Sequence, residues 1–493
     1  MRNDADRSIK QKTVTGIFWK LMENGGNQLI SLVITVILAR LIDPSLYGTL
    51  SLTVIFTSIA NVLVQRGFNL SLVQKRDADE LDFSSVFWFS FAVAGGLYAA
   101  LFLAAPAIAA FYRTPEVKTI LRVIALILFT GAVGSIQYAI VMREMAFRAR
   151  FIVSFVSTVL SGAVGIGMAV LGFGVWALVA QQLIDGLVMA VGLTVVTKWL
   201  PKRRFSFARL RTLFSFGWKL LVSSLLETVY SEITGLIIGR RYNTEMLAYY
   251  DKGRRFPNIV GTNLSGAIQA AMFPAFTTAQ DDRERLLTMV RRSVATSAFV
   301  VFPMLAGMAA LATPIVSVLL TDKWLPAAPF LMIFALTFAM YPIDATVLQA
   351  INALGRSDVY LKLEIAKKVA GIALLAVGVF LFDTAAALAW ALAGTAVLSV
   401  LFNAIPAKRL IGYRYGMLAA DTLPTLLLSL AMGGAVYLLT RTGLEPLVLL
   451  IAGVPLGAAV YVLGAWGLRL ESFRFCVRSV KEILTRRGAR GGA

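Results

Sequence analysis

Polar side chains recur every three or four residues inside stretches of the sequence that are otherwise apolar. This spacing places side chains along one side of a helix. Four stripes have this pattern: Lys20, Asn24 and Gln28; Lys219, Ser223, Glu227 and Ser231; Thr49, Thr53, Thr57 and Asn61; Asp251, Arg254, Asn258, Thr262 and Ser265. We expect them to line one water-filled cavity. One alternative is that the hydroxyl groups form hydrogen bonds with the backbone of their own helix, and we favour this alternative for the third stripe taken alone. Another is that the side chains of Lys20 and Lys219 extend to the membrane surface.

The fourth stripe is strongly basic, which indicates the charge of a ligand. Lys252 and Arg255 lie beside Arg254, and Asp251 can offset only one of the three cations. Ammonium and guanidinium groups bind phosphates and carboxylates. The residues predicted to bind an anion such as a phosphate or an acidic sugar are Lys20, Asn24, Gln28, Lys219, Lys252, Arg254, Arg255 and Asn258. The alternative is a helix that begins later and leaves the cations of the fourth stripe at the membrane surface.

Acidic residues inside the apolar stretches include Glu23, Glu227 and Asp344, with Asp185 as a further candidate. A carboxylate within a membrane can exchange a proton or a sodium ion, so these residues are candidates for ion coupling. Salt bridging, for example of Glu23 with Lys20, is an equal alternative. The absence of histidine and the single cysteine argue against zinc, haem or iron–sulfur sites. We therefore expect no cofactor beyond H⁺ or Na⁺, no metal site and no catalytic residue.

The composition indicates that lipid is the solvent for most of the chain. Of 493 residues, 58% are hydrophobic and 15% are charged, against about 45–50% and about 25% in soluble proteins. A spanning helix needs about 20 largely apolar residues. Fourteen stretches qualify: 15–40, 46–65, 83–111, 117–140, 150–172, 174–197, 213–239, 247–277, 292–320, 327–352, 360–382, 384–405, 417–438 and 445–467. The first is too long for a signal peptide and is predicted to be retained.

The distribution of basic residues gives the orientation. Net charge is +20, and Lys and Arg concentrate in cytoplasmic loops of bacterial membrane proteins. With fourteen helices and a cytoplasmic N-terminus, the basic clusters at 66–76, 143–150, 198–211, 283–292 and 408–414 all fall inside, whereas the opposite loops hold few cations. The prediction is a multi-pass protein of the bacterial inner membrane with both termini in the cytoplasm.

An internal repeat organises the helices. Trp19-Lys20 and Trp218-Lys219 begin two similar segments, which end in Ala39-Arg40 and Gly239-Arg240. Six helices separate the copies, so both run in the same direction, as in transporters built from parallel repeats. The predicted fold is all-α, with an N-terminal lobe at 1–200, a C-terminal lobe at 201–412, two extra helices at 413–468 and a basic cytoplasmic tail at 469–493. Apolar residues at helical spacing in the tail predict an amphipathic helix on the anionic leaflet.

Three segments carry a family resemblance: 39–48 (ARLIDPSLYG), 271–275 (AMFPA), and 349–358 (QAINALGRSD) with 361–365 (LKLEI). The sequence resembles the polysaccharide transporters of the multidrug/oligosaccharidyl-lipid/polysaccharide flippase superfamily, in the branch that exports colanic acid or succinoglycan. The resemblance implies two six-helix lobes around a cationic cavity. It also implies that the cargo is an undecaprenyl-pyrophosphate-linked oligosaccharide, flipped to the periplasmic leaflet by alternating access.

The resemblance leaves other functions to be weighed. An ion-coupled drug or cation antiporter of the same superfamily favours an acidic or aromatic cavity, and a peptidoglycan-precursor flippase carries a similar lipid. A membrane glycosyltransferase or polymerase usually needs a soluble domain or a long loop, which this sequence lacks, so an enzyme is not expected. Expected partners are the lipid-linked oligosaccharide, the bilayer and the polysaccharide polymerase or export machinery, with no nucleic acid. A monomer suffices for alternating access.

Overall fold

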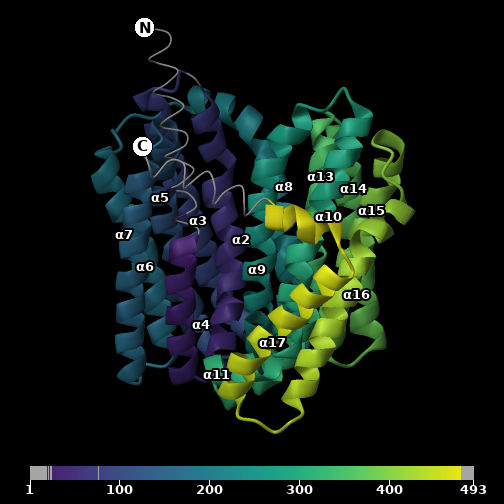
Figure 1. Cartoon of the computed structure of the whole chain (residues 1–493). Helices are drawn as coiled ribbons and strands as arrows, with labels where there is room; N and C mark the ends of the chain where they lie inside the picture. The colour runs from purple at the N-terminus through teal and green to yellow at the C-terminus, as the bar shows by residue number, and fades with distance from the viewer. Residues whose placement is uncertain (1–18, 20–21, 23–24, 76, 479–493) are drawn as a thin grey trace, which may run out of the picture. The chain divides into compact units, whose positions relative to one another are not determined.

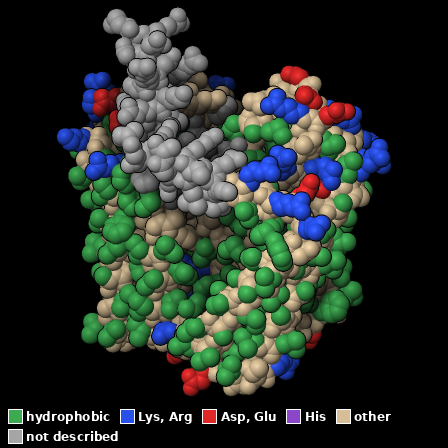
Figure 2. All heavy atoms as spheres, viewed as in Figure 1, with side chains coloured by type: hydrophobic (Ala, Val, Ile, Leu, Met, Phe, Trp, Pro, Cys, Tyr) green, Lys and Arg blue, Asp and Glu red, His purple; other side chains and the backbone are tan. Residues whose placement is uncertain are grey.

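The computed structural model describes residues 19, 22, 25–75 and 77–478, and within that range the regular structure is helical (Figure 1). The chain divides into two compact units, the first unit (Met1–Ala248) and the second unit (Tyr249–Ala493). On the drawn face of each unit, hydrophobic side chains cover the middle and Lys and Arg gather mainly toward one end (Figure 2). This distribution suits helices that cross an apolar layer.

The first unit begins with a helix at Gly25–Leu41. It continues with α2 (Pro44–Gln74), α3 (Glu80–Tyr112), α4 (Glu116–Ile124), α5 (Ile127–Glu144), α6 (Phe147–Val170), α7 (Val175–Thr197) and α8 (Phe207–Arg241). The side chain of Asp79 accepts a hydrogen bond from the Asp82 N–H, and this capping box fixes the start of α3. Arg113, Met145 and Lys198 adopt left-handed backbone conformations that end α3, α5 and α7.

The second unit contains the rest of the chain, with α9 beginning just before the division between the units. Its elements are α9 (Thr244–Thr277), α10 (Arg283–Ala310), α11 (Ala312–Leu320), the 3₁₀ helix η1 (Asp322–Ala327), α12 (Ala328–Ala339), α13 (Tyr341–Ala353), α14 (Ser357–Leu381), α15 (Ala385–Leu410), α16 (Tyr415–Thr440) and α17 (Pro446–Gly467). Pro342 stands at the start of α13, where the predicted stretch 327–352 is interrupted. Trp324, Phe334 and Tyr250 are fully buried in this unit.

The predicted all-α membrane fold is confirmed, and eleven of the fourteen predicted spans correspond to described helices that are long and apolar enough to cross a membrane. The other three predicted stretches correspond to the short apolar helix Gly25–Leu41, to α9 and to α14. Because α9 begins at Thr244, Lys252, Arg254 and Arg255 lie inside this helix rather than ahead of it.

The repeat is visible where its copies turn. The helix that ends at Leu41 is followed by α2 at Pro44, and α8 ends at Arg241 before α9 begins at Thr244. The two turns thus lie 200 positions apart. In the second turn, the Asn243 side chain accepts a hydrogen bond of 2.7 Å from the Met246 N–H, which satisfies a free donor at the start of α9.

Helix α8 packs against α2 within the first unit. Small residues allow the approach: a Cβ added to Gly239 meets Leu52 at 2.4 Å, and one added to Gly48 meets the Thr244 carbonyl oxygen at 1.6 Å. The repeat assigns α8 to the lobe predicted at 201–412, whereas its packing assigns it to the first unit. The lobe boundary predicted at residue 200 therefore stays a prediction that follows from the repeat.

Candidate functional site

The predicted binding residues are distributed over both units. Lys20, Glu23 and Asn24 lie outside the described residues. Gln28 is half-buried in the helix Gly25–Leu41, while Lys219 and Glu227 are exposed on α8. The structure therefore places the described members of the first two stripes in the first unit, and Lys252, Arg254, Arg255 and Asn258 in the second.

Lys252 is a buried cation near the start of α9. Only 6% of its surface is exposed, and its ammonium lies 5.6 Å from the centre of the Trp324 ring. Trp324 packs edge-on against Tyr249, whose hydroxyl donates a hydrogen bond to the Lys323 carbonyl at 3.3 Å. A cation over an indole face is stabilised by the ring's negative face, so aromatic residues hold the Lys252 charge in place.

The neighbouring basic residues are more accessible. Arg254, Arg255 and Asn258 are half-buried. Close packing holds this part of α9 against α12, because a Cβ added to Gly253 meets Phe330 at 2.5 Å and the Ala327 carbonyl oxygen at 2.8 Å. The rigid start of α9 thus presents two guanidinium groups within three residues of the buried Lys252.

Asp344 belongs to a charge cluster that joins three helices of the second unit. Lys367 of α14 lies 3.1 Å from an Asp344 carboxylate oxygen and 3.1 Å from Glu364 Oε1. Asn403 of α15, itself fully buried, donates to Asp344 Oδ1 at 2.9 Å. The side chain of Lys367 is only 7% exposed. The sequence pointed to Asp344 as an ion-coupling candidate but did not reveal its contacts with Lys367 and Asn403.

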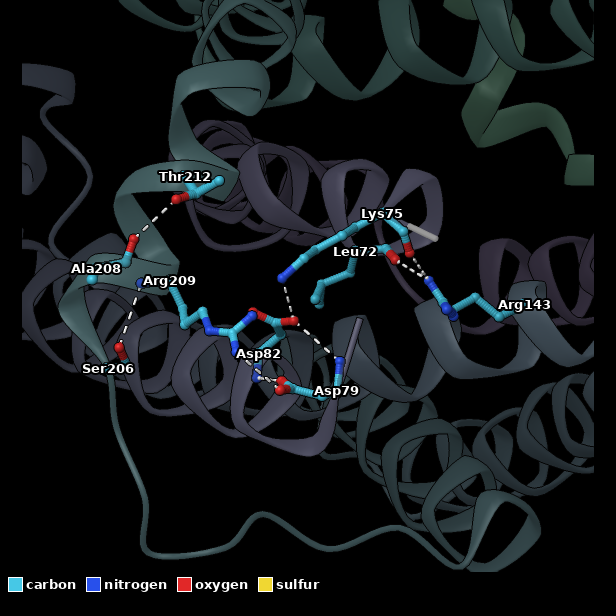
Figure 3. Close-up of polar contacts among 9 residues, drawn as sticks. All are labelled: Leu72, Lys75, Asp79, Asp82, Arg143, Ser206, Ala208, Arg209 and Thr212. Atoms are coloured by element: carbon cyan, nitrogen blue, oxygen red, sulfur yellow. Dashed lines mark hydrogen bonds and ion pairs between the residues drawn. The ribbon is translucent and has the colours of Figure 1, made fainter. Parts of the chain in front are cut away.

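A second charge cluster lies where α2, α3 and α8 meet (Figure 3). Asp82 is buried and accepts a hydrogen bond from Lys75 Nζ at 2.6 Å. Arg209 of α8 pairs with Asp79 at 3.2 Å. Arg143 donates to the Leu72 carbonyl at 2.7 Å, which ties the end of α5 to the end of α2. The N–H of Asp82, together with Arg209, lowers the pKa of Asp79 below its ordinary value.

A third cluster attaches helix α16 to α10. Arg291 forms two hydrogen bonds with the Asp421 carboxylate, at 3.0 and 2.7 Å. The Tyr413 hydroxyl donates to the same carboxylate at 3.1 Å, and burial raises the pKa of this tyrosine above its ordinary value. Because Arg291 and Asp421 neutralise each other, the geometry of this cluster supports a structural role.

These features define a polytopic α-helical membrane protein with paired charges inside its helix bundles. The chain belongs to the polysaccharide biosynthesis protein family, whose sequence model matches residues 37–329. The succinoglycan biosynthesis transport protein ExoT of Rhizobium meliloti is 26% identical over 92% of this chain and 93% of its own. The lipopolysaccharide biosynthesis protein WzxC of Escherichia coli is 21% identical over 75% of this chain and 76% of its own.

Solved structures share the fold. The lipid II flippase MurJ, in an inward closed conformation, superposes with a TM-score of 0.71 at 16% identity, covering 91% of this chain and 98% of that one. An inward-facing multidrug resistance transporter of the MATE family has a TM-score of 0.60 at 16% identity, and the match covers 78% of this chain and 95% of the transporter's chain. The family resemblance and the fold class predicted from the sequence are thus confirmed.

Proposed function

We propose that this protein moves an undecaprenyl-pyrophosphate-linked oligosaccharide repeat unit from the cytoplasmic to the periplasmic leaflet of the bacterial inner membrane. The observation that carries the proposal is the match to ExoT, a succinoglycan transport protein, over nearly the whole of both chains. Transport by alternating access needs a single copy of the chain. Both termini are assigned to the cytoplasm, and a polymerase or export partner is assigned to the periplasmic side, where the cargo is released.

The pyrophosphate is assigned to the basic part of α9. Arg254 and Arg255 are half-buried in α9, which matches the predicted span 247–277, and a guanidinium can form two parallel hydrogen bonds with a phosphate. The ammonium of Lys252 already lies over the Trp324 ring. We therefore propose that Lys252 attracts the pyrophosphate through its charge and does not contact it directly. Lys20, Asn24, Gln28, Lys219 and Asn258 remain predicted binding residues.

Ion coupling is assigned to Asp344, and we favour a proton over a sodium ion. Lys367 already supplies a cation within 3.1 Å of this carboxylate. Protonation of Asp344 removes its negative charge and leaves the ammonium to Glu364, which also lies 3.1 Å away. A proton can therefore switch the pairing of Lys367 without any further ligand.

Deletion and complementation in the source bacterium test the proposed cargo. In the deletion strain, wild type should restore secreted polysaccharide, whereas Arg254→Ala/Arg255→Ala should lose most export and leave lipid-linked repeat units facing the cytoplasm. Arg285→Ala/Lys362→Ala, which removes two exposed cations of the second unit, is the matched control and should export normally. Unchanged export and lipid pools, with increased sensitivity to cationic drugs in the deletion strain, would instead establish a drug antiporter.

A further inference from the structure

The linker between α7 and α8 is fastened to the first turns of α3. The backbone N–H of Lys202 donates to the Ser84 hydroxyl at 3.1 Å, and the N–H of Ser206 donates to the Ser85 hydroxyl at 2.9 Å. The indole N–H of Trp88 donates to the Lys202 carbonyl at 2.9 Å. Three side chains of α3 therefore hold the linker as a defined surface.

Helix lengths place this surface at the level of the lipid headgroups. Helix α7 has 23 residues, which span about 34 Å at 1.5 Å per residue, close to the roughly 30 Å thickness of a hydrocarbon core. The linker begins directly after α7. The part of α8 that qualifies as a membrane span is Gly217–Arg241. The ten residues of α8 before it include Arg209 and Arg211, so we place them at the membrane surface as well. A tryptophan at this level is typical of a membrane interface.

The same segment has more cations than its acidic neighbours can neutralise. Lys202 pairs with Glu80, and Arg209 pairs with Asp79 (Figure 3 shows the second pair). The other four cations are exposed and have no acidic partner among the residues that the structure describes: Lys198, Arg203, Arg204 and Arg211. Glu80 and Asp79 are thus already paired, and an excess of four positive charges remains at the membrane surface.

Large apolar side chains are exposed between these cations. Leu200 is 69% exposed, Phe205 52% and Phe207 71%. Apolar surface in contact with water costs about 25 cal/mol per Å². We therefore expect another molecule to bury these apolar side chains. Alternation of aromatic and basic residues is the composition of surfaces that lie in the interface of an anionic membrane.

We propose that residues 198–211, the linker surface, form a binding site for anionic phospholipid. The phosphate headgroups contact Lys198, Arg203, Arg204 and Arg211, and the apolar side chains of the linker enter the boundary of the hydrocarbon core. Because the linker is bonded to α3, bound lipid fixes the depth of the α3–α8 corner in the bilayer. This inference does not depend on the identity of the transported cargo.

Lipid titration of the purified full-length chain tests the site. In neutral detergent, native mass spectrometry should show phosphatidylglycerol binding more tightly than phosphatidylcholine. Each basic residue near an anionic surface contributes about five-fold in affinity, so Arg203→Gln/Arg204→Gln should weaken phosphatidylglycerol binding about 30-fold. Arg285→Gln/Lys362→Gln removes the same charge from exposed positions of the second unit and should leave the affinity within about two-fold.

Several outcomes would overturn the proposal. They are equal binding of the two lipids, an equal loss in both double variants, and displacement of phosphatidylglycerol by millimolar inorganic phosphate, which would identify a free-anion site. A nitroxide at Phe205→Cys in a Cys476→Ser background provides a second measurement in liposomes. Strong collisions with oxygen support insertion into lipid, whereas protection from both oxygen and a water-soluble relaxation agent would show that protein covers the surface.

Discussion

At the scale of single residues, the informative side chains are charges buried with their partners. Lys367 contacts Asp344 and Glu364 at 3.1 Å and is 7% exposed. Lys75 and Asp82 form a comparable pair at the start of α3, where Asp82 is fully buried. Removing one member of a buried pair leaves an uncompensated charge. The effect of a substitution on the free energy of unfolding therefore depends more on whether the charge has a partner than on the charge itself.

Lys367→Met should destabilise the protein by about 3 kcal/mol, because it leaves Asp344 and Glu364 to repel each other without the shared ammonium. Lys368 lies 3.7 Å from Glu364 and is 26% exposed, so Lys368→Met should cost less than about 1 kcal/mol. Thermal unfolding of the purified variants measures both. Adding Asp344→Asn to Lys367→Met should recover part of the loss, and a double variant less stable than the single one would refute the pairing.

At the scale of elements, glycines determine how closely the helices of the first unit approach. Gly235 and Gly239 of α8 face Ile55 and Leu52 of α2, and Gly48 lies against the backbone of Thr244. Glycine is costly inside a helix, by about 1 kcal/mol relative to alanine. That cost is offset where the missing Cβ lets two backbones meet.

Gly48→Ala should therefore lower stability by about 1–3 kcal/mol, because its Cβ would lie 1.6 Å from the Thr244 carbonyl oxygen and backbone must move. A methyl group added at Gly96 of α3 would meet nothing within 4 Å apart from its chain neighbours and the backbone of its own helix, so Gly96→Ala should be neutral or stabilising. The midpoint of thermal unfolding distinguishes the two. Equal effects would show that α2 and the start of α9 are farther apart than the structure has them.

At the scale of the whole molecule, apolar length was sufficient to predict eleven candidate spanning helices, since each needs about 20 consecutive residues. The residues of the candidate site were only partly predictable. The spacing of Glu364 and Lys367 is visible in the sequence, but the contacts of Asp344 with Lys367 and Asn403 depend on packing between α13, α14 and α15. The basic run at 198–211 indicated orientation, and only the structure separated its paired cations from its exposed ones.

Orientation in the membrane is tested with single cysteines in a Cys476→Ser background. Thr442→Cys lies between α16 and α17, and Asp281→Cys lies between α9 and α10; both positions are exposed. Five predicted helices separate them, so they should lie on opposite sides of the membrane.

A membrane-impermeant maleimide should modify Thr442→Cys in intact cells and Asp281→Cys only after lysis, because the basic loops remain in the cytoplasm. Lysed cells, in which both cysteines react, are the control for accessibility. The reverse pattern would place the linker surface and both termini in the periplasm, and the direction of transport proposed for the cargo would then be wrong. Modification of both cysteines in intact cells would mean that the number of crossings between α9 and α17 is even.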